Sequence, residues 1–85
     1  MMQLESKPKY HYDKDFDSLT IFLDRSDNAF SEEVINNVYF VKDEDDDRLV
    51  SIEILYFMNR SLQNLQNVLP NNIYNFVKKL YDNDL

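Results

Sequence analysis

The chain has 85 residues and contains no glycine. Glycine adopts positive φ angles at the lowest cost, and the favoured two-residue hairpin turns require such angles. Asparagine and aspartate tolerate positive φ better than other residues, so they must make these turns here. The sequence therefore predicts turns at its clusters of Asn and Asp, which are residues 13–17 (DKDFD), Asn36-Asn37 and residues 43–47 (DEDDD).

The segments between these turns alternate between apolar and polar residues, as strands with one buried face do. Residues 18–23 (SLTIFL) place Leu19 and Ile21 on one face, and residues 48–57 (RLVSIEILYF) show the same alternation. Three shorter segments, YHY, EEVI and VYFVKD, also have the composition of strands. Together these segments predict a four- to five-stranded antiparallel meander over residues 10–57.

The hydrophobic period changes in the C-terminal part of the chain. Leu62, Leu65 and Leu69 have helical spacing, which predicts a helix over about residues 59–68. A second helix is predicted over about residues 71–82, because its apolar residues recur at i, i+3, i+4, i+7 and i+8. These apolar residues are Ile73, Phe76, Val77, Leu80 and Tyr81.

These elements predict a single domain of the α+β class over residues 10–85, preceded by a flexible leader at residues 1–9. One face of the predicted sheet carries about a dozen large apolar side chains, and burying each contributes roughly 1.5–3 kcal/mol. We therefore expect one or two C-terminal helices to pack on that face.

The absence of cysteine suits a reducing compartment, because secreted domains of this size usually need disulfides. The N-terminal residues, MMQLESKPKYHYD, contain no apolar core of a signal peptide. No apolar stretch approaches the roughly 18 residues that a membrane span needs. We expect a cytoplasmic protein that does not enter a membrane.

The charge of the chain is strongly acidic, with 16 acidic and 9 basic residues and a formal net charge of −7. Contact with nucleic acid needs lysine and arginine to neutralise phosphates, so this charge disfavours direct binding of DNA or RNA. It favours a basic protein partner.

Asp13, Asp15 and Asp17 have the spacing of the first three ligands of an EF-hand calcium loop. Ser18 occupies the position at which that loop needs glycine, and a strand pattern follows at once. We therefore predict no metal site. Instead, the aspartates should turn the chain by accepting hydrogen bonds from backbone N–H groups two residues further on.

The sequence shows no set of catalytic residues. Glu53 lies among apolar residues (SIEIL), but an outward position on a strand accounts for it. His11 is the only histidine, and a zinc site within one chain needs more ligands. Without glycine the chain cannot form a phosphate-binding loop or a nucleophile elbow. We expect a protein that is not an enzyme and uses no cofactor.

Two stretches of the chain resemble a known family. They are YDKDFDSLTIFL at residues 12–23 and EEVINNVYFVKDEDDDRLVSIEIL at residues 32–55. They are similar to the Y-D-x-x-x-D-x-L-x-I-x-L start and the V-x-x-D-x-D-x-x-x-x-V-x-I-E-I-L hairpin of the small prokaryotic family catalogued as Domain of Unknown Function 2283. The resemblance covers about residues 10–62, although this chain has Asn37 and Asp47 near the places where the family usually has glycine. It implies a single sheet with a short helix. Because some members are encoded beside toxins that resemble small ribonucleases, it also implies an antitoxin-like role.

The first functional hypothesis is therefore an acidic protein-binding module that neutralises a basic partner such as a small ribonuclease toxin. Complementary charge speeds encounter and fixes orientation, and apolar anchors supply affinity. The anchors should come from the second sheet face, and the charges from the acidic turn and Glu53. The predicted partner-binding residues are Phe22, Tyr39, Val41, Asp43, Glu44, Asp45, Asp46, Asp47, Glu53, Leu55 and Phe57.

Two alternatives remain open at this stage. A DNA-mimic inhibitor of a nucleic-acid-binding enzyme would need its carboxylates in phosphate-like rows, whereas here they gather in two turns. A homo-oligomeric structural protein, or a homodimer, would bury the second sheet face against another copy. A C-terminal helix is another candidate cover for that face.

Overall fold

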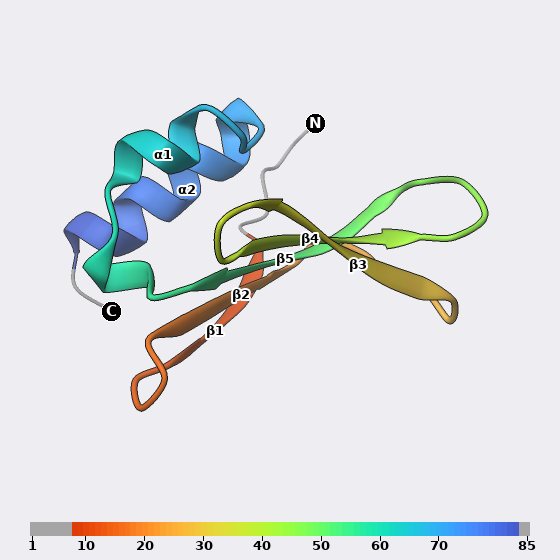
Figure 1. Ribbon diagram of the computed structural model, residues 1–85, viewed down its shortest axis with the longest axis horizontal. Coiled ribbons are helices and arrows are strands. Elements are labelled where there is room, and N and C mark those ends of the chain that lie inside the picture. The colour runs from red at the N-terminus through yellow and green to blue at the C-terminus, as the bar shows by residue number, and fades with distance from the viewer. Residues whose placement is uncertain (1–7, 84–85) are drawn as a thin grey trace, which may run out of the picture.

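Residues 8–83 of the computed structural model form five antiparallel strands, a short 3₁₀ helix and two α-helices, in that order (Figure 1). The strands are β1 (Lys9–Asp13), β2 (Ser18–Phe22), β3 (Ala29–Ile35), β4 (Val38–Asp43) and β5 (Leu49–Leu55). After them come η1 (Phe57–Asn59), α1 (Leu62–Gln66) and α2 (Asn71–Asp82). The structure describes residues 8–83, and within that range no helix is long and apolar enough to cross a membrane.

The predicted α+β class is confirmed, with an antiparallel sheet followed by C-terminal helices on one of its faces. The predicted bounds of α2 match the structure. The first predicted helix is shorter than expected, because η1 and α1 share the segment and Ser61 begins α1 by accepting a hydrogen bond from Gln63 N. Residues 1–7 of the predicted leader lie outside the described residues, and Lys9 already belongs to β1.

The strand order is β1-β2-β5-β4-β3, which is meander-like with one exception. Strands β3, β4 and β5 are joined by turns and pair with their neighbours, but β2 pairs with β5 and not with β3. The connection over residues 23–28 passes the end of the β4–β5 hairpin and enters the sheet at its far edge. Strand β5 is therefore the central strand of the sheet, between β4, which precedes it directly in sequence, and the distant β2.

Arg48 holds this connection in place from the β4–β5 turn. Its Nε lies 2.8 Å from Asp24 Oδ2, and its Nη2 donates to the carbonyl oxygen of Arg25 at 2.7 Å. Nearby, the Ser26 hydroxyl donates to Asp43 Oδ2 at 2.6 Å. The crossover depends on polar side chains at separated positions, which strand alternation alone does not reveal.

The edge strand β3 carries an irregularity that interrupts its pairing. Glu33 pairs with Tyr39 and Ile35 pairs with Val38, so Val34 is an additional residue, a β-bulge. Residues 29–33 of this strand are all exposed.

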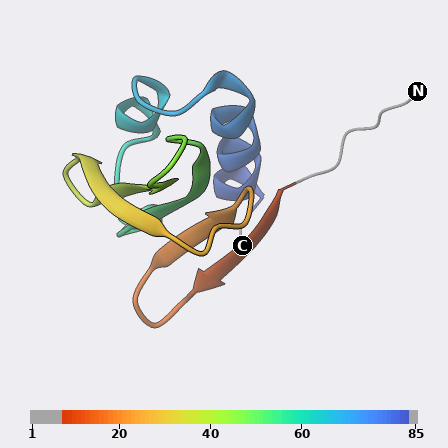
Figure 2. The same cartoon turned by 90° about the vertical axis from the view of Figure 1, so that its right-hand side faces the viewer.

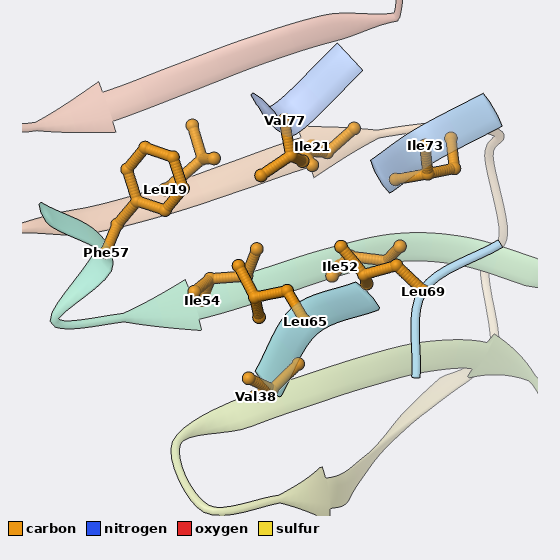
Figure 3. Close-up of a cluster of buried hydrophobic side chains, with 10 residues drawn as sticks. All are labelled: Leu19, Ile21, Val38, Ile52, Ile54, Phe57, Leu65, Leu69, Ile73 and Val77. Carbon is orange, nitrogen blue, oxygen red and sulfur yellow. The ribbon is translucent and has the colours of Figure 1, made fainter. Parts of the chain in front are cut away.

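The core fills the space between one face of the sheet and the helices, which both lie on that side (Figures 1 and 2). The sheet contributes buried Leu and Ile side chains from β2 and β5 and Val38 from β4, in agreement with the predicted alternation. The helical segment contributes four more buried side chains (Figure 3). These four are Leu65, Leu69, Ile73 and Val77.

Four described residues have positive φ, and three of them are the expected aspartates or asparagine. Asp17 ends the β1–β2 turn with φ 53°, Asn37 lies in the β3–β4 turn with φ 67°, and Asp47 ends the β4–β5 turn with φ 61°. The prediction from the missing glycine is confirmed at these positions. Tyr56, with φ 55°, is the exception, and it lies directly after β5.

Phe57 corrects one expectation, because it belongs to the core and not to the second sheet face. The left-handed backbone of Tyr56 ends the strand, so the next side chain turns toward the helices instead of continuing the alternation. The Phe57 ring is fully buried and packs edge-to-face on Tyr12 and Tyr81, with centroid distances of 6.2 and 5.7 Å. Phe57 is therefore a packing residue and is withdrawn from the partner-binding set.

We expect Phe57→Leu to lower the free energy of unfolding by about 1–2 kcal/mol, because it leaves a void in a dense core. Phe22→Leu is the matched control: the same change at a ring that is 49% exposed should cost less than about 0.5 kcal/mol. Urea denaturation followed by circular dichroism measures both. Equal losses for the two variants would contradict the placement of Phe57.

Candidate protein-binding surface

The face of the sheet opposite the helices, here called the outer face, is left uncovered by the described residues (Figure 2). The strand register aligns Phe22 with Ser51 and Val41 in one row across the sheet. The next row aligns Thr20 with Glu53 and Tyr39. The predicted placement of Phe22, Tyr39, Val41, Glu53 and Leu55 on one face is confirmed, whereas their binding of a partner stays a prediction.

The outer face combines four apolar side chains with the carboxylate of Glu53. Phe22 is half exposed, Tyr39, Val41 and Leu55 are partly exposed, and none of these four packs against the core cluster. Partly exposed Glu53 stands beside Tyr39 in the middle of this surface. Such a mixture resembles the core and rim of protein-binding patches more than a face that merely contacts water.

One end of the outer face is hollowed into a cavity of about 580 Å³, here called the acidic hollow. Ser18, Glu53 and Leu55 of the sheet contribute to its lining. The end of β1, the β1–β2 turn and the residue after β5 provide the remaining lining residues, which are Asp13, Asp15, Phe16 and Tyr56. Its aromatic side chains are very open to solvent: Phe16 is 75% and Tyr56 is 56% exposed.

The β1–β2 turn owes its shape to Asp13, as the sequence predicted. Asp13 Oδ1 accepts hydrogen bonds from the backbone N–H groups of Asp15, at 3.0 Å, and Phe16, at 3.3 Å. The Asp13 carboxylate thus satisfies the backbone N–H groups of the turn. The Phe16 side chain takes no part in these bonds and is exposed to solvent.

Asp17 connects the same turn to the segment that follows the sheet. Its Oδ1 accepts the Met58 N–H at 2.9 Å and the Tyr12 hydroxyl at 2.6 Å, and its Oδ2 accepts the Asn59 amide at 2.8 Å. Its backbone carbonyl also accepts the N–H of Phe57 at 2.9 Å. These bonds fix the two chain segments that supply Phe16 and Tyr56 to the acidic hollow.

The hydrogen bonds at Asp17 also shift two pKa values. Desolvation alone would raise the pKa of Asp17, but the bonds from Tyr12, Met58 and Asn59 outweigh it and lower that pKa below the ordinary 3.8. The hydrogen bond to Asp17, together with desolvation, raises the pKa of Tyr12 from 10.0 to about 12. Across neutral pH the pair therefore consists of a carboxylate and a neutral phenol.

The β4–β5 turn repeats the geometry of the β1–β2 turn. Asp43 Oδ1 accepts the N–H groups of Asp45, at 2.7 Å, and Asp46, at 3.3 Å, and Asp47 closes the turn with positive φ. The hydrogen bond from Ser26 and that from Asp45 N–H lower the pKa of Asp43. The two turns lie at opposite ends of the sheet, because the pairing sets the β1–β2 turn beside the end of β5 and the β4–β5 turn beside its start (Figure 1).

The acidic segment 43–47 was expected to be an exposed binding cluster, and Asp43 corrects that expectation. Asp43 is 8% exposed, since its carboxylate satisfies the N–H groups of its own turn. Asp46 is partly neutralised by Arg48, whose Nη1 lies 2.8 Å from Asp46 Oδ2. Glu44, Asp45 and Asp47 are exposed, but their turn is far along the sheet from the acidic hollow, so we place them outside the candidate binding surface.

The carboxylates of the acidic hollow differ from those of the opposite turn, because no described residue forms an ion pair with them. Asp13, Asp15 and Glu53 line the hollow without a basic side chain from residues 8–83 among its lining residues. Within the same residues, no group of three or more His, Asp or Glu side chains is arranged to hold a metal ion. The hollow thus presents negative charge to an open, partly aromatic space.

Sequence reasoning included Glu53 and Leu55 in the binding set but missed the rest of the hollow. Phe16 could have been found, since a lone aromatic residue inside a turn of aspartates has no core to join. Asp13 and Asp15 were assigned to the turn alone. Tyr56 gave no signal, because its exposure follows from a backbone angle.

The chain was also compared with protein-family models, with curated proteins and with solved structures, and no match was found.

The Tyr12–Asp17 pair should give stability a characteristic pH dependence. Because the pKa of Asp17 is lowered on folding, its contribution is present above pH 3.8 and is lost as the pH falls below that value. Because the pKa of Tyr12 is raised, its contribution is present below pH 10.0 and is lost as the pH rises through about 12. Urea denaturation over a series of pH values measures both limbs.

We expect Tyr12→Phe to be less stable than the wild type by about 1–3 kcal/mol at neutral pH, since it removes a hydrogen bond to a charged acceptor. That difference should shrink above pH 10.0. Tyr74→Phe removes the same hydroxyl from a partly buried tyrosine of α2 and is the matched control. A difference that stays constant up to pH 12 would show that the Tyr12 hydrogen bond does not form.

Proposed function

We propose that the chain is a non-enzymatic protein-binding module whose outer face binds a basic protein. The observation that carries the proposal is the uncovered outer face, which combines apolar side chains with carboxylates that form no ion pair within residues 8–83. Burial of Phe22, Val41 and Leu55 would supply affinity, because hot spots form where apolar side chains leave water. Glu53 and the carboxylates of the acidic hollow would select the sign of the partner.

The net charge of −7 favours a basic partner over a second copy of the chain. Two molecules of equal negative charge repel, whereas a basic protein is attracted over roughly the Debye length of 8–10 Å at physiological salt. The separation of the two acidic turns to opposite ends of the sheet also breaks any continuous row of carboxylates, which a DNA mimic would need.

A small ribonuclease toxin is the partner class that fits this surface and the family resemblance together. Such enzymes must hold RNA phosphates with basic side chains, so the face that an inhibitor has to cover is positively charged. We propose an antitoxin-like role of this kind in the cytoplasm, a reducing compartment in which domains do not rely on disulfides. The chain would block the RNA-binding surface of its partner and would not touch RNA itself.

The test starts from affinity capture with the purified chain in a lysate of its native host, followed by mass spectrometry. The captured protein is then purified and its binding is measured by isothermal titration calorimetry. We expect a basic protein, and an RNA-cleaving activity of that protein that stops at an equimolar amount of the chain. Phe22→Ala and Glu53→Lys should each weaken binding about tenfold or more.

Two variants away from the outer face serve as controls. Phe30→Ala removes a phenylalanine ring that is 37% exposed and lies on the opposite side of the sheet, because Phe30 alternates with Ser31 of the outer face. Glu44→Lys changes the net charge by the same amount as Glu53→Lys but lies in the β4–β5 turn. Capture of an acidic protein, or equal losses in the control and outer-face variants, would refute the proposal. A dimer in sedimentation that Phe22→Ala dissociates would assign the face to a second copy instead.

A further inference from the structure

We propose that the acidic hollow is a receptor for one arginine side chain of the basic partner, with Tyr56 as the residue that selects it. This inference rests on the proposed function and names the group that the partner inserts. The hollow is lined by three carboxylates and two exposed aromatic side chains, and it has a volume of about 580 Å³.

The carboxylates set the charge and the size of the occupant. Asp13, Asp15 and Glu53 line the hollow from the end of β1, the β1–β2 turn and β5. Because these carboxylates come from separate elements, an extended cation can reach more of them than a compact one. A guanidinium group is such a cation, because its five N–H donors form a planar fork that reaches several oxygens at once.

The aromatic side chains supply the second half of the recognition. Phe16 and Tyr56 line the hollow and keep most of their surface in water. Guanidinium groups stack on aromatic faces more readily than ammonium groups, since guanidinium is planar and more weakly hydrated. A site that combines carboxylates with aromatic rings therefore favours arginine over lysine.

The backbone of Tyr56 indicates that its side chain serves a purpose outside the fold. A bulky residue is unfavourable in the left-handed region, in which Tyr56 has φ 55° and ψ 44°. Its side chain is 56% exposed and is not among the side chains that pack against the core cluster. Asparagine would adopt the same backbone angles at lower cost. We therefore attribute the presence of tyrosine at this position to its role as a lining residue of the acidic hollow.

The test uses a short peptide, acetyl-Gly-Ser-Arg-Ser-Gly-amide, titrated into the ¹⁵N-labelled chain and followed by NMR. We expect saturable shifts at the amides of residues 13–16 and 53–56. The same peptide with citrulline, which is similar in shape but uncharged, should cause none, and the lysine peptide should bind more weakly. Glu53→Gln should weaken binding of the arginine peptide by about three- to tenfold. Glu44→Gln, the same change at the other end of the sheet, should leave binding unaltered.

Tyr56 is tested by variants that separate binding from folding. Tyr56→Asn should keep or raise the urea midpoint while weakening the arginine peptide by about two- to fivefold. Tyr56→Phe should restore binding, because it keeps the aromatic ring. A lowered midpoint for Tyr56→Asn with unaltered binding would show that the tyrosine is structural and would overturn the inference.

The remaining outcomes separate this inference from the proposed function. Equal shifts with arginine and citrulline peptides, equal binding of the lysine peptide, or shifts confined to residues 43–47 would overturn the arginine receptor. If the captured partner still depends on Phe22 in that case, the binding module stands without its arginine site. If that dependence is absent as well, both proposals fall.

Discussion

The carboxylate of Asp17 is the interaction on which the arrangement of this small fold depends. It receives a hydrogen bond from Tyr12 in β1 and others from Met58 and Asn59 in the segment that leaves the sheet. The chain there must turn from strand to helix within two residues, and Phe57 must reach the core in the same step. With no glycine or disulfide to stabilise that turn, a partly exposed set of charge-assisted hydrogen bonds does so. The hydrogen bonds of Asp17 therefore hold both the segment that leads to the helices and the residues that line the acidic hollow.

The two aspartate turns show how the same local structure can have different consequences. In both turns, the carboxylate of the first aspartate accepts hydrogen bonds from the N–H groups two and three residues further on, and the last aspartate has positive φ. In the β4–β5 turn, Arg48 binds several of the surrounding carboxylates and ties down the crossing connection, which makes that turn part of the scaffold. In the β1–β2 turn, no described basic residue lines the acidic hollow, and an aromatic ring stands beside the charge. The ion pairs of Arg48 are thus what distinguishes the carboxylates of the β4–β5 turn from those of the acidic hollow.

The sequence predicts the features that depend on local patterns, and it misses those that depend on one angle or one distant contact. Alternation was enough to assign the buried face of β5, and helical period was enough to place α2. The missing glycine was enough to place Asp17, Asn37 and Asp47 at positive φ. By contrast, β2 pairs with β5, and the connection that follows β2 is held by Arg48 and Ser26, which carry no periodic signal. The position of Phe57 follows from the backbone of Tyr56, and a strand pattern that runs through both residues cannot reveal it.

The bulge in β3 affects the tendency of this protein to aggregate through the edge of its sheet. An edge strand of seven residues offers its free N–H and C=O groups to any passing chain, which is how sheets polymerise. Val34 puts the ladder out of register partway along that edge, and two neighbouring glutamates, Glu32 and Glu33, place charge where a stacking neighbour would have to lie. A growing fibril would have to accommodate the kink and bury the charges in every added layer. This edge of the sheet therefore disfavours the addition of a strand from another copy of the chain.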